Sequence, residues 1–285
     1  MDTVSPYGLV LGGGGPVGAA WYAGLASGLA DEGVDLGLAA VIIGTSAGAW
    51  AGAWLASDES DGFVAAMDRL GNGPEPLKMD VDLVAQVSAL MGDAVAPLGP
   101  PETQRIGELA QRVPAVGVRF YARHLPDTPW PERFRALVVH AQTGELRVLG
   151  PADRIPLEFG VAASCAPAGI APPVVLADGP YMDGGARSAT NADVLIGQGV
   201  DRAIVASPVP PDTPMIGSAV QRVLQEEGHR LSAAGIRFET ILPTDVEKDA
   251  FGYDLINHSK IRVAIEVGRA RAHSEASRLR AFIEG

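Results

Sequence analysis

Short apolar runs alternate with helix-forming stretches along most of this chain. Residues 7–11 (YGLVL) and 39–43 are compact apolar runs that predict buried strands, and each is followed by an alanine-rich stretch, 19–30 and 47–56, that predicts a helix. A hairpin around the Asp-Gly-Pro turn at 178–180 is expected over 174–182. Further strands are expected at 134–140, 144–149, 202–207 and 236–242, and helices at 156–163, 216–233 and 251–282. This strand–helix alternation predicts an α/β fold with a mainly parallel central sheet.

Residues 58–131 interrupt the alternation. They predict helices at 61–70, 81–91 and 103–112, separated by segments rich in glycine and proline. A helical insertion of this kind either caps a site or only packs against the domain, and the sequence is compatible with both. We therefore expect one α/β domain over 7–200 that carries this insertion, completed by a C-terminal strand–helix extension over 201–285.

Composition limits the classes of partner. The 285 residues are 47% hydrophobic and 20% charged, which suffices for a sizeable core. The net charge of −12 argues against nucleic acid, whose phosphates bind lysine and arginine. It also provides no attraction to an anionic membrane, so we expect at most transient membrane-surface contact. The single Cys165 indicates a reducing compartment, and the N-terminus lacks a basic segment before its apolar stretch, which makes the cytoplasm the expected location.

A glycine-rich loop follows the first predicted strand. Residues 12–18 (GGGGPVG) join it to a helix, an arrangement in which backbone amides turn inward and bind anions. Gly13, Gly15 and Gly18 also match the dinucleotide-binding pattern G-x-G-x-x-G. That pattern needs an acidic residue at the end of the second strand, where this chain has Gly44-Thr45-Ser46. Dinucleotide binding is therefore the weaker interpretation, and no cofactor is expected.

The second predicted strand leads into Gly44-Thr45-Ser46-Ala47-Gly48, a G-x-S-x-G sequence between a strand and a helix. In this context a serine on a strained turn becomes a nucleophile, and glycines allow the helix to pack closely behind it. The helix N-terminus favours negative charge that develops beside Ser46. The alternative is a glycine- and serine-rich bend that only joins two elements.

An acid for this chemistry is found far along the chain. Asp183 follows the predicted hairpin and precedes Gly184 and Gly185, a setting that turn chemistry alone does not explain. A Ser-His-Asp triad would take its base from one of the histidines, and a Ser-Asp dyad would use Asp183 directly. The α/β-hydrolase fold, which uses such a triad, places several strands before its nucleophile, whereas here only the strand at 7–11 precedes the strand that leads into Ser46. None of the five histidines lies in a loop shaped by glycine or proline after a strand: His124, His140, His229, His258 and His273. We favour the dyad, which requires a poorly solvated carboxylate with a raised pKa.

Four separate pieces of the sequence together resemble the patatin-like phospholipase family. The matching pieces, in order, are 13–18 (GGGPVG), 44–48 (GTSAG), 163–164 with 172–173, and 183–185 (DGG), over roughly residues 7–200. The resemblance implies a three-layer α/β/α fold, a Ser46–Asp183 dyad and hydrolysis of lipid acyl esters without a metal. The oxyanion donors are expected from the backbone amides of Gly13, Gly14, Gly15 and Ala47.

One position departs from the family pattern. The family's loop usually has arginine or lysine before its last glycine, whereas this chain has Val17. Loss of that cation weakens the positive potential available to a phospholipid head group. It also supports an alternative in which the chain is a catalytically silent relative that holds a lipid or a partner. Asn191 stands where the family often has asparagine, and the sequence leaves the oligomeric state open.

Overall fold

The computed structural model describes residues 6–73, 79–114 and 123–285. Its strands form one sheet, hydrogen-bonded in the order β5-β6-β3-β2-β1-β7-β8, with β4 paired to β3. The β3-β2-β1-β7-β8 part is parallel, which confirms the mainly parallel sheet predicted from the sequence. The strands are β1 (Tyr7–Leu11), β2 (Val41–Gly44), β3 (Phe134–His140), β4 (Leu146–Leu149), β5 (Val174–Leu176), β6 (Gly179–Asp183), β7 (Arg202–Ala206) and β8 (Arg237–Ile241).

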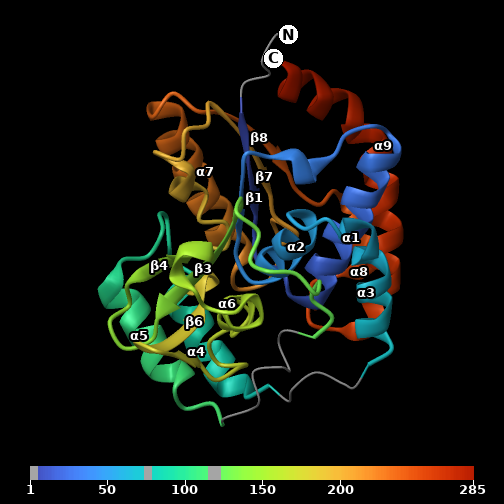
Figure 1. Cartoon of the computed structure of the whole chain (residues 1–285). Helices are drawn as coiled ribbons and strands as arrows, with labels where there is room; N and C mark the ends of the chain where they lie inside the picture. The colour runs from blue at the N-terminus through green and yellow to red at the C-terminus, as the bar shows by residue number, and fades with distance from the viewer. Residues whose placement is uncertain (1–5, 74–78, 115–122) are drawn as a thin grey trace.

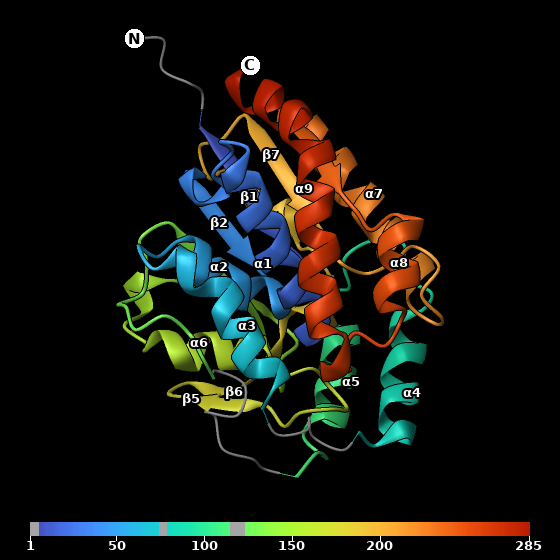
Figure 2. The ribbon, with the colours of Figure 1, turned by 90° about the vertical axis from the view of Figure 1, so that its right-hand side faces the viewer.

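Helices cover both faces of the sheet and give the expected three layers (Figure 1). One layer contains α1, α2, α3, α6, α8 and α9, and α7, α4 and α5 lie against the opposite face (Figures 1 and 2). The helices are α1 (Gly15–Asp31), α2 (Ala47–Leu55), α3 (Phe63–Gly71), α4 (Val81–Met91), α5 (Pro100–Ala110), α6 (Leu157–Ser164), α7 (Gly217–Ala233), α8 (Asp245–Phe251) and α9 (Ile261–Glu284). Short 3-10 turns are η1 (Leu36–Leu38), η2 (Ser60–Gly62), η4 (Pro151–Asp153), η5 (Gly184–Ala186), η6 (Ala192–Leu195) and η7 (His258–Lys260).

The period-2 pattern of the strands places apolar cores on both faces of the sheet. Leu9 and Ile42 point toward α1 and α2, whereas Val10 and Ile43 point toward α7 and η6. The long helices α1 and α9 lie in close backbone contact. Only a glycine fits at position 24 of α1, since a Cβ there would lie 2.0 Å from the carbonyl oxygen of Ile265 in α9. The core therefore fixes α1, and with it the glycine loop at its start, against the rest of the domain.

Strand pairing brings the ends of β2 and β6 together. Ala136 of β3 pairs with β2 on one side and with β4 on the other, and Val138 pairs with β6 on one side and with β4 on the other. Strands β2 and β6 therefore share one edge of β3. Because β2 is parallel to β3 and β6 is antiparallel to it, their carboxyl ends approach each other near Leu137. The residues that follow these two ends are those of the serine turn and the DGG segment.

The element boundaries differ from the predicted ones mainly at helix starts. Helix α1 begins at Gly15 inside the glycine loop, not at residue 19. Helix α8 was not predicted, although Thr244 and Glu247 form a capping box at its start. The expected helix over 251–282 begins only at Ile261. Within the described ranges, no helix is long and apolar enough to cross a bilayer.

Candidate active site

Ser46 lies on a strained turn between β2 and α2. Its φ of 56° and ψ of −120° are unusual for a residue with a side chain and expose the hydroxyl at the end of the strand. The two glycines of the motif are required by close packing. A Cβ at Gly48 would lie 1.8 Å from the carbonyl oxygen of Leu11, and one at Gly44 would lie 2.4 Å from the carbonyl oxygen of Gly48. The turn thus has the geometry expected of a nucleophile elbow.

The structure brings Asp183 to Ser46. The Ser46 side chain lies next to the Asp183 carboxylate and acts on its pKa as a hydrogen-bonding neighbour, and the Gly185 N–H donates a hydrogen bond to Asp183 Oδ1 at 2.7 Å. Asp183 is buried, with 4% of its surface exposed. Burial raises the pKa of Asp183 from 3.8 to about 7, although the neighbouring Ser46 side chain and the Gly185 N–H act to lower it. A carboxylate with this pKa takes up and releases a proton near neutral pH, as a general base must.

The glycine loop lies directly against the serine. A Cβ at Gly13 would lie 3.3 Å from Ser46 Cβ and 3.9 Å from its Oγ, so the glycine leaves space around the hydroxyl. The Gly13 N–H, however, donates to the carbonyl oxygen of Ala189 at 2.8 Å and is not available to an oxyanion. Among the described residues, the N–H groups of Gly14, Gly15 and Ala47 have no protein acceptor, which leaves these three as candidate donors.

The remaining motif glycines serve close packing. A Cβ at Gly18 would lie 2.6 Å from Pro208 Cγ, and one at Gly184 would lie 2.7 Å from the carbonyl oxygen of Leu137. Gly185 has a different role, because its N–H donates a hydrogen bond to the Asp183 carboxylate. These glycines hold the loop and the DGG segment close to the sheet edge.

The end of α6 holds the backbone of the serine turn. Ser164 Oγ accepts the Ser46 N–H at 3.0 Å and donates to the carbonyl oxygen of Leu137 at 2.8 Å. The Cys165 thiol donates to the carbonyl oxygen of Ser46 at 3.2 Å. Burial, with the charge of Asp183, raises the pKa of the Cys165 thiol, which keeps it protonated and weakly nucleophilic. The family resemblance pointed to Ser164, but nothing in the sequence showed that it supports Ser46.

Asn191 links the serine turn to the DGG segment. Its Nδ2 donates to Thr45 Oγ1 and to the carbonyl oxygen of Gly184, each at 3.2 Å, and to that of Ser188 at 2.7 Å. Its backbone is left-handed, with φ of 53°, a conformation that asparagine tolerates better than most residues. Asn191 is fully buried, so these bonds replace all of its contacts with water.

The histidines contact other parts of the molecule. His140 packs edge-on against Tyr181, the exposed His229 lies 3.9 Å from Glu226, and His273 pairs with Glu32 at 2.8 Å. In the part of the chain that is described, no hydrogen bond or ion pair joins a histidine to Ser46 or Asp183. The geometry thus favours Asp183 over a histidine as the group that accepts the serine proton.

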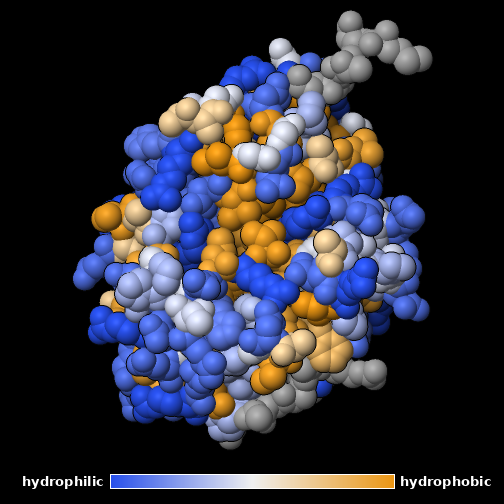
Figure 3. Space-filling view, turned by 60° about the vertical axis from the view of Figure 1, so that its left-hand side comes forward, coloured by the Kyte–Doolittle hydropathy of each residue, from blue (hydrophilic) through white to orange (hydrophobic). Residues whose placement is uncertain are grey.

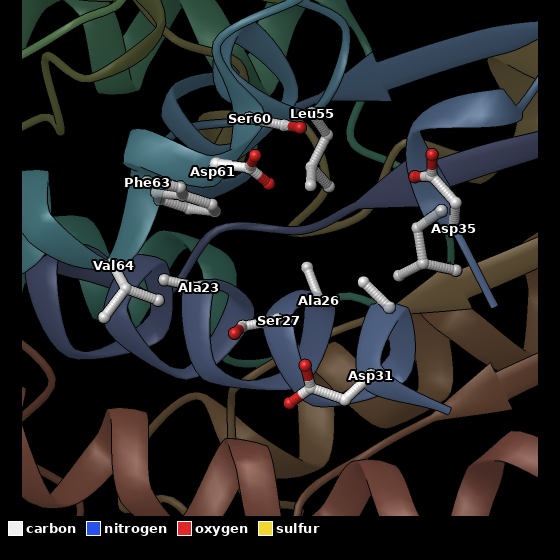
Figure 4. A pocket seen from close by; sticks show the side chains of 12 residues that line it. Ala23, Ala26, Ser27, Asp31, Asp35, Leu55, Ser60, Asp61, Phe63 and Val64 are labelled. Atoms are coloured by element: carbon white, nitrogen blue, oxygen red, sulfur yellow. The ribbon is translucent and has the colours of Figure 1, made fainter. Parts of the chain in front are cut away.

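A separate cavity of about 160 Å³ lies between α1 and the start of α3 (Figure 4). Ala23, Ser27, Asp31 and Phe63 are among its lining residues, and it includes no residue of the serine site. Its volume is below the roughly 300–1,000 Å³ of sites for drug-sized ligands. Over the described ranges, no group of three or more histidine, cysteine or acidic residues is placed to hold a metal ion.

A family model described as Patatin-like phospholipase matches residues 9–196. This range covers roughly two-thirds of the chain and extends from β1 to η6. A search of curated proteins found no match.

Proposed function

The chain belongs to the patatin-like phospholipase family, and from this premise we propose that it hydrolyses lipid acyl esters through a Ser46–Asp183 dyad. The resemblance carried by the sequence motifs is thereby confirmed. One observation supports the proposed activity above the others: the Ser46 side chain, on its strained turn, lies next to a buried carboxylate whose pKa is raised to about 7. A serine becomes a nucleophile when an adjacent base of suitable pKa accepts its proton.

The proposed reaction has two steps. In the first, Asp183 takes the proton of Ser46 Oγ as that oxygen attacks the ester carbonyl carbon, and the tetrahedral oxyanion accepts hydrogen bonds from the amides of Gly14, Gly15 and Ala47. Asp183 then returns the proton to the leaving alcohol, and an acyl-Ser46 ester remains. In the second step Asp183 accepts a proton from a water molecule as the water oxygen attacks the acyl carbon. The bond from that carbon to Ser46 Oγ then breaks, Ser46 Oγ takes the proton back from Asp183, and the fatty acid leaves.

The surroundings favour substrates without an anionic head group. Val17 is fully buried at the position where the family usually has a cation, so its side chain offers no charge to a phosphate. The net charge of −12 repels anions at long range. On the side of the molecule in Figure 3, apolar side chains gather in a band flanked by polar residues, and surfaces of this kind often mark ligand or lipid contacts. We therefore propose neutral or zwitterionic acyl esters as the preferred class.

The test replaces the nucleophile. Ser46→Ala should abolish release of p-nitrophenol from p-nitrophenyl acyl esters and should prevent labelling by a fluorophosphonate probe, while the protein stays folded. Ser27→Ala, in the separate cavity on α1, serves as the matched control and should keep both activities. Turnover at the wild-type rate by Ser46→Ala would exclude Ser46 from the mechanism. A wild-type protein that is neither labelled nor active would instead indicate a silent, lipid-holding relative.

A further inference from the structure

The segment 188–192 contacts all three parts of the candidate site. The carbonyl oxygen of Ala189 accepts the Gly13 N–H at 2.8 Å and so holds the glycine loop. Asn191 bonds Thr45 of the serine turn and Gly184 of the DGG segment. The segment has little regular structure of its own, because its only helical part is the 3-10 turn that begins at Ala192. Its position therefore depends on what holds it from outside.

A single side chain of α7 holds this segment. Glu227 Oε1 accepts the Ser188 hydroxyl at 2.7 Å, and its Oε2 accepts the Thr190 hydroxyl at 2.5 Å and the Ala192 N–H at 3.0 Å. Ser188 Oγ in turn accepts the backbone N–H groups of Thr190 and Asn191 at 3.2 and 3.0 Å. One carboxylate thus fixes both ends and the middle of the segment.

Packing alone does not account for an acid at this place. Glu227 has no exposed surface, and its burial raises the pKa of the carboxyl while the hydroxyls of Ser188 and Thr190 lower it. A buried carboxylate is costly unless hydrogen bonds compensate it, and an apolar side chain of similar volume often stabilises as well or better. An apolar side chain, however, accepts no hydrogen bonds, so it could not hold three donor groups of one loop in fixed positions.

We propose that Glu227 is a positioning residue for the hydrolysis proposed above, on which this inference rests. By fixing 188–192 it holds the Gly13 amide through Ala189 and the serine turn through Asn191. It thereby sets the distance between Ser46 and the free amides of the glycine loop. Glu227 acts only through these neighbours and does not itself touch the dyad, because its three donors all belong to 188–192.

The test compares two buried carboxylates. Glu227→Gln keeps the shape of the side chain but replaces an acceptor oxygen with a donor, so the segment loses at least one of its bonds. Glu247→Gln is the matched control, since Glu247 is also buried and accepts three bonds, from Trp21 Nε1, the Thr244 N–H and the Thr244 hydroxyl, away from the dyad. Both variants should lower the melting temperature.

Only Glu227→Gln should lower kcat, by about 10-fold with KM changed less than about two-fold, because the misplaced donors act in the transition state. Labelling of Ser46 by the fluorophosphonate probe should slow by a similar factor. A folded Glu227→Gln protein with wild-type kcat and labelling rate would overturn the inference, as would an equal loss of kcat in Glu247→Gln. If Glu227→Gln does not fold, Thr190→Val is the second variant, because it removes one hydrogen-bond donor at nearly constant shape. An unchanged kcat in Thr190→Val would also overturn the inference.

The wild-type protein separates this inference from the function on which it rests. Labelling of wild-type Ser46 together with equal labelling of Glu227→Gln refutes only the positioning role. Absence of labelling in the wild type refutes the proposed hydrolase, and the positioning role with it.

Discussion

Replacement of Asp183 by asparagine should remove activity and increase stability. An aspartate whose pKa is raised in the folded protein binds its proton more tightly there than in the unfolded chain. Stability therefore falls as the pH rises from 3.8 to about 7 and stays at the lower level above that range. Asparagine is neutral at every pH and escapes this cost, but it cannot take the proton of Ser46.

The size of the effect follows from the burial of the carboxyl. Since one pKa unit corresponds to about 1.4 kcal/mol, the ionised Asp183 lowers the free energy of unfolding by roughly 4 kcal/mol above pH 7. The amide makes weaker hydrogen bonds with Ser46 and Gly185, which offsets about 1 kcal/mol. We expect Asp183→Asn to be more stable than the wild type by about 3 kcal/mol at pH 8 and by about 1 kcal/mol at pH 5.5.

Urea unfolding of both proteins between pH 5.5 and 8 measures this difference. Asp178→Asn is the matched control on the same hairpin. Asp178 is exposed. Burial raises its pKa, but the hydrogen bonds from Tyr181 and Arg147 and the charge of Arg147 together outweigh burial, so the pKa is lowered overall. Because a lowered pKa matters only at acid pH, the stability difference for Asp178→Asn should stay constant over this range. A stability gain of Asp183→Asn that does not grow with pH, or no gain at all, would refute the assignment of Asp183 as a buried base.

Two further predictions concern the same site. The value of kcat/KM for a p-nitrophenyl ester should rise with pH to a plateau and reach half its maximum near pH 7, because only ionised Asp183 accepts the serine proton; a flat profile from pH 5.5 to 8.5 would contradict this role. Ser164→Ala should lower the free energy of unfolding by about 1–3 kcal/mol and reduce kcat, because it leaves the Ser46 N–H without its acceptor. Urea unfolding and ester kinetics measure both effects, and a variant with wild-type values would show that Ser164 does not support the turn.

Local patterns along the chain were sufficient to predict most elements. Strand β3 and helix α4 have the boundaries expected from their apolar runs and neighbouring breakers. The helix start at Gly15 was missed because alanine content indicated residue 19, whereas the helix begins within the glycine loop, with Pro16 in its first turn. Sequence motifs also suggested the roles of Ser46 and Asp183, since a strained turn and a DGG segment have local signatures.

Contacts between distant segments could not be predicted in this way. No pattern in the sequence shows that Glu227, on a helix far along the chain, holds the segment at 188–192, because a glutamate on an amphipathic helix usually lies on the solvated face. The hydrogen bond from the Gly13 N–H to the carbonyl oxygen of Ala189 likewise could not be predicted, because the sequence does not show where the segment 188–192 lies. For this reason Gly13 is left out of the oxyanion donors proposed above.

The sequence by itself determined which backbone turns are possible: glycines at 44 and 48 permit the strained conformation of Ser46, and alternation of strands and helices requires a layered α/β fold. Only the tertiary structure decided that Ser46 and Asp183 meet. That contact exists because β2 and β6 run toward each other along the same edge of β3, and strand pairing of this kind depends on the packing of the whole sheet. The raised pKa of Asp183 has the same origin, since burial is a property of the assembled layers and not of the DGG segment.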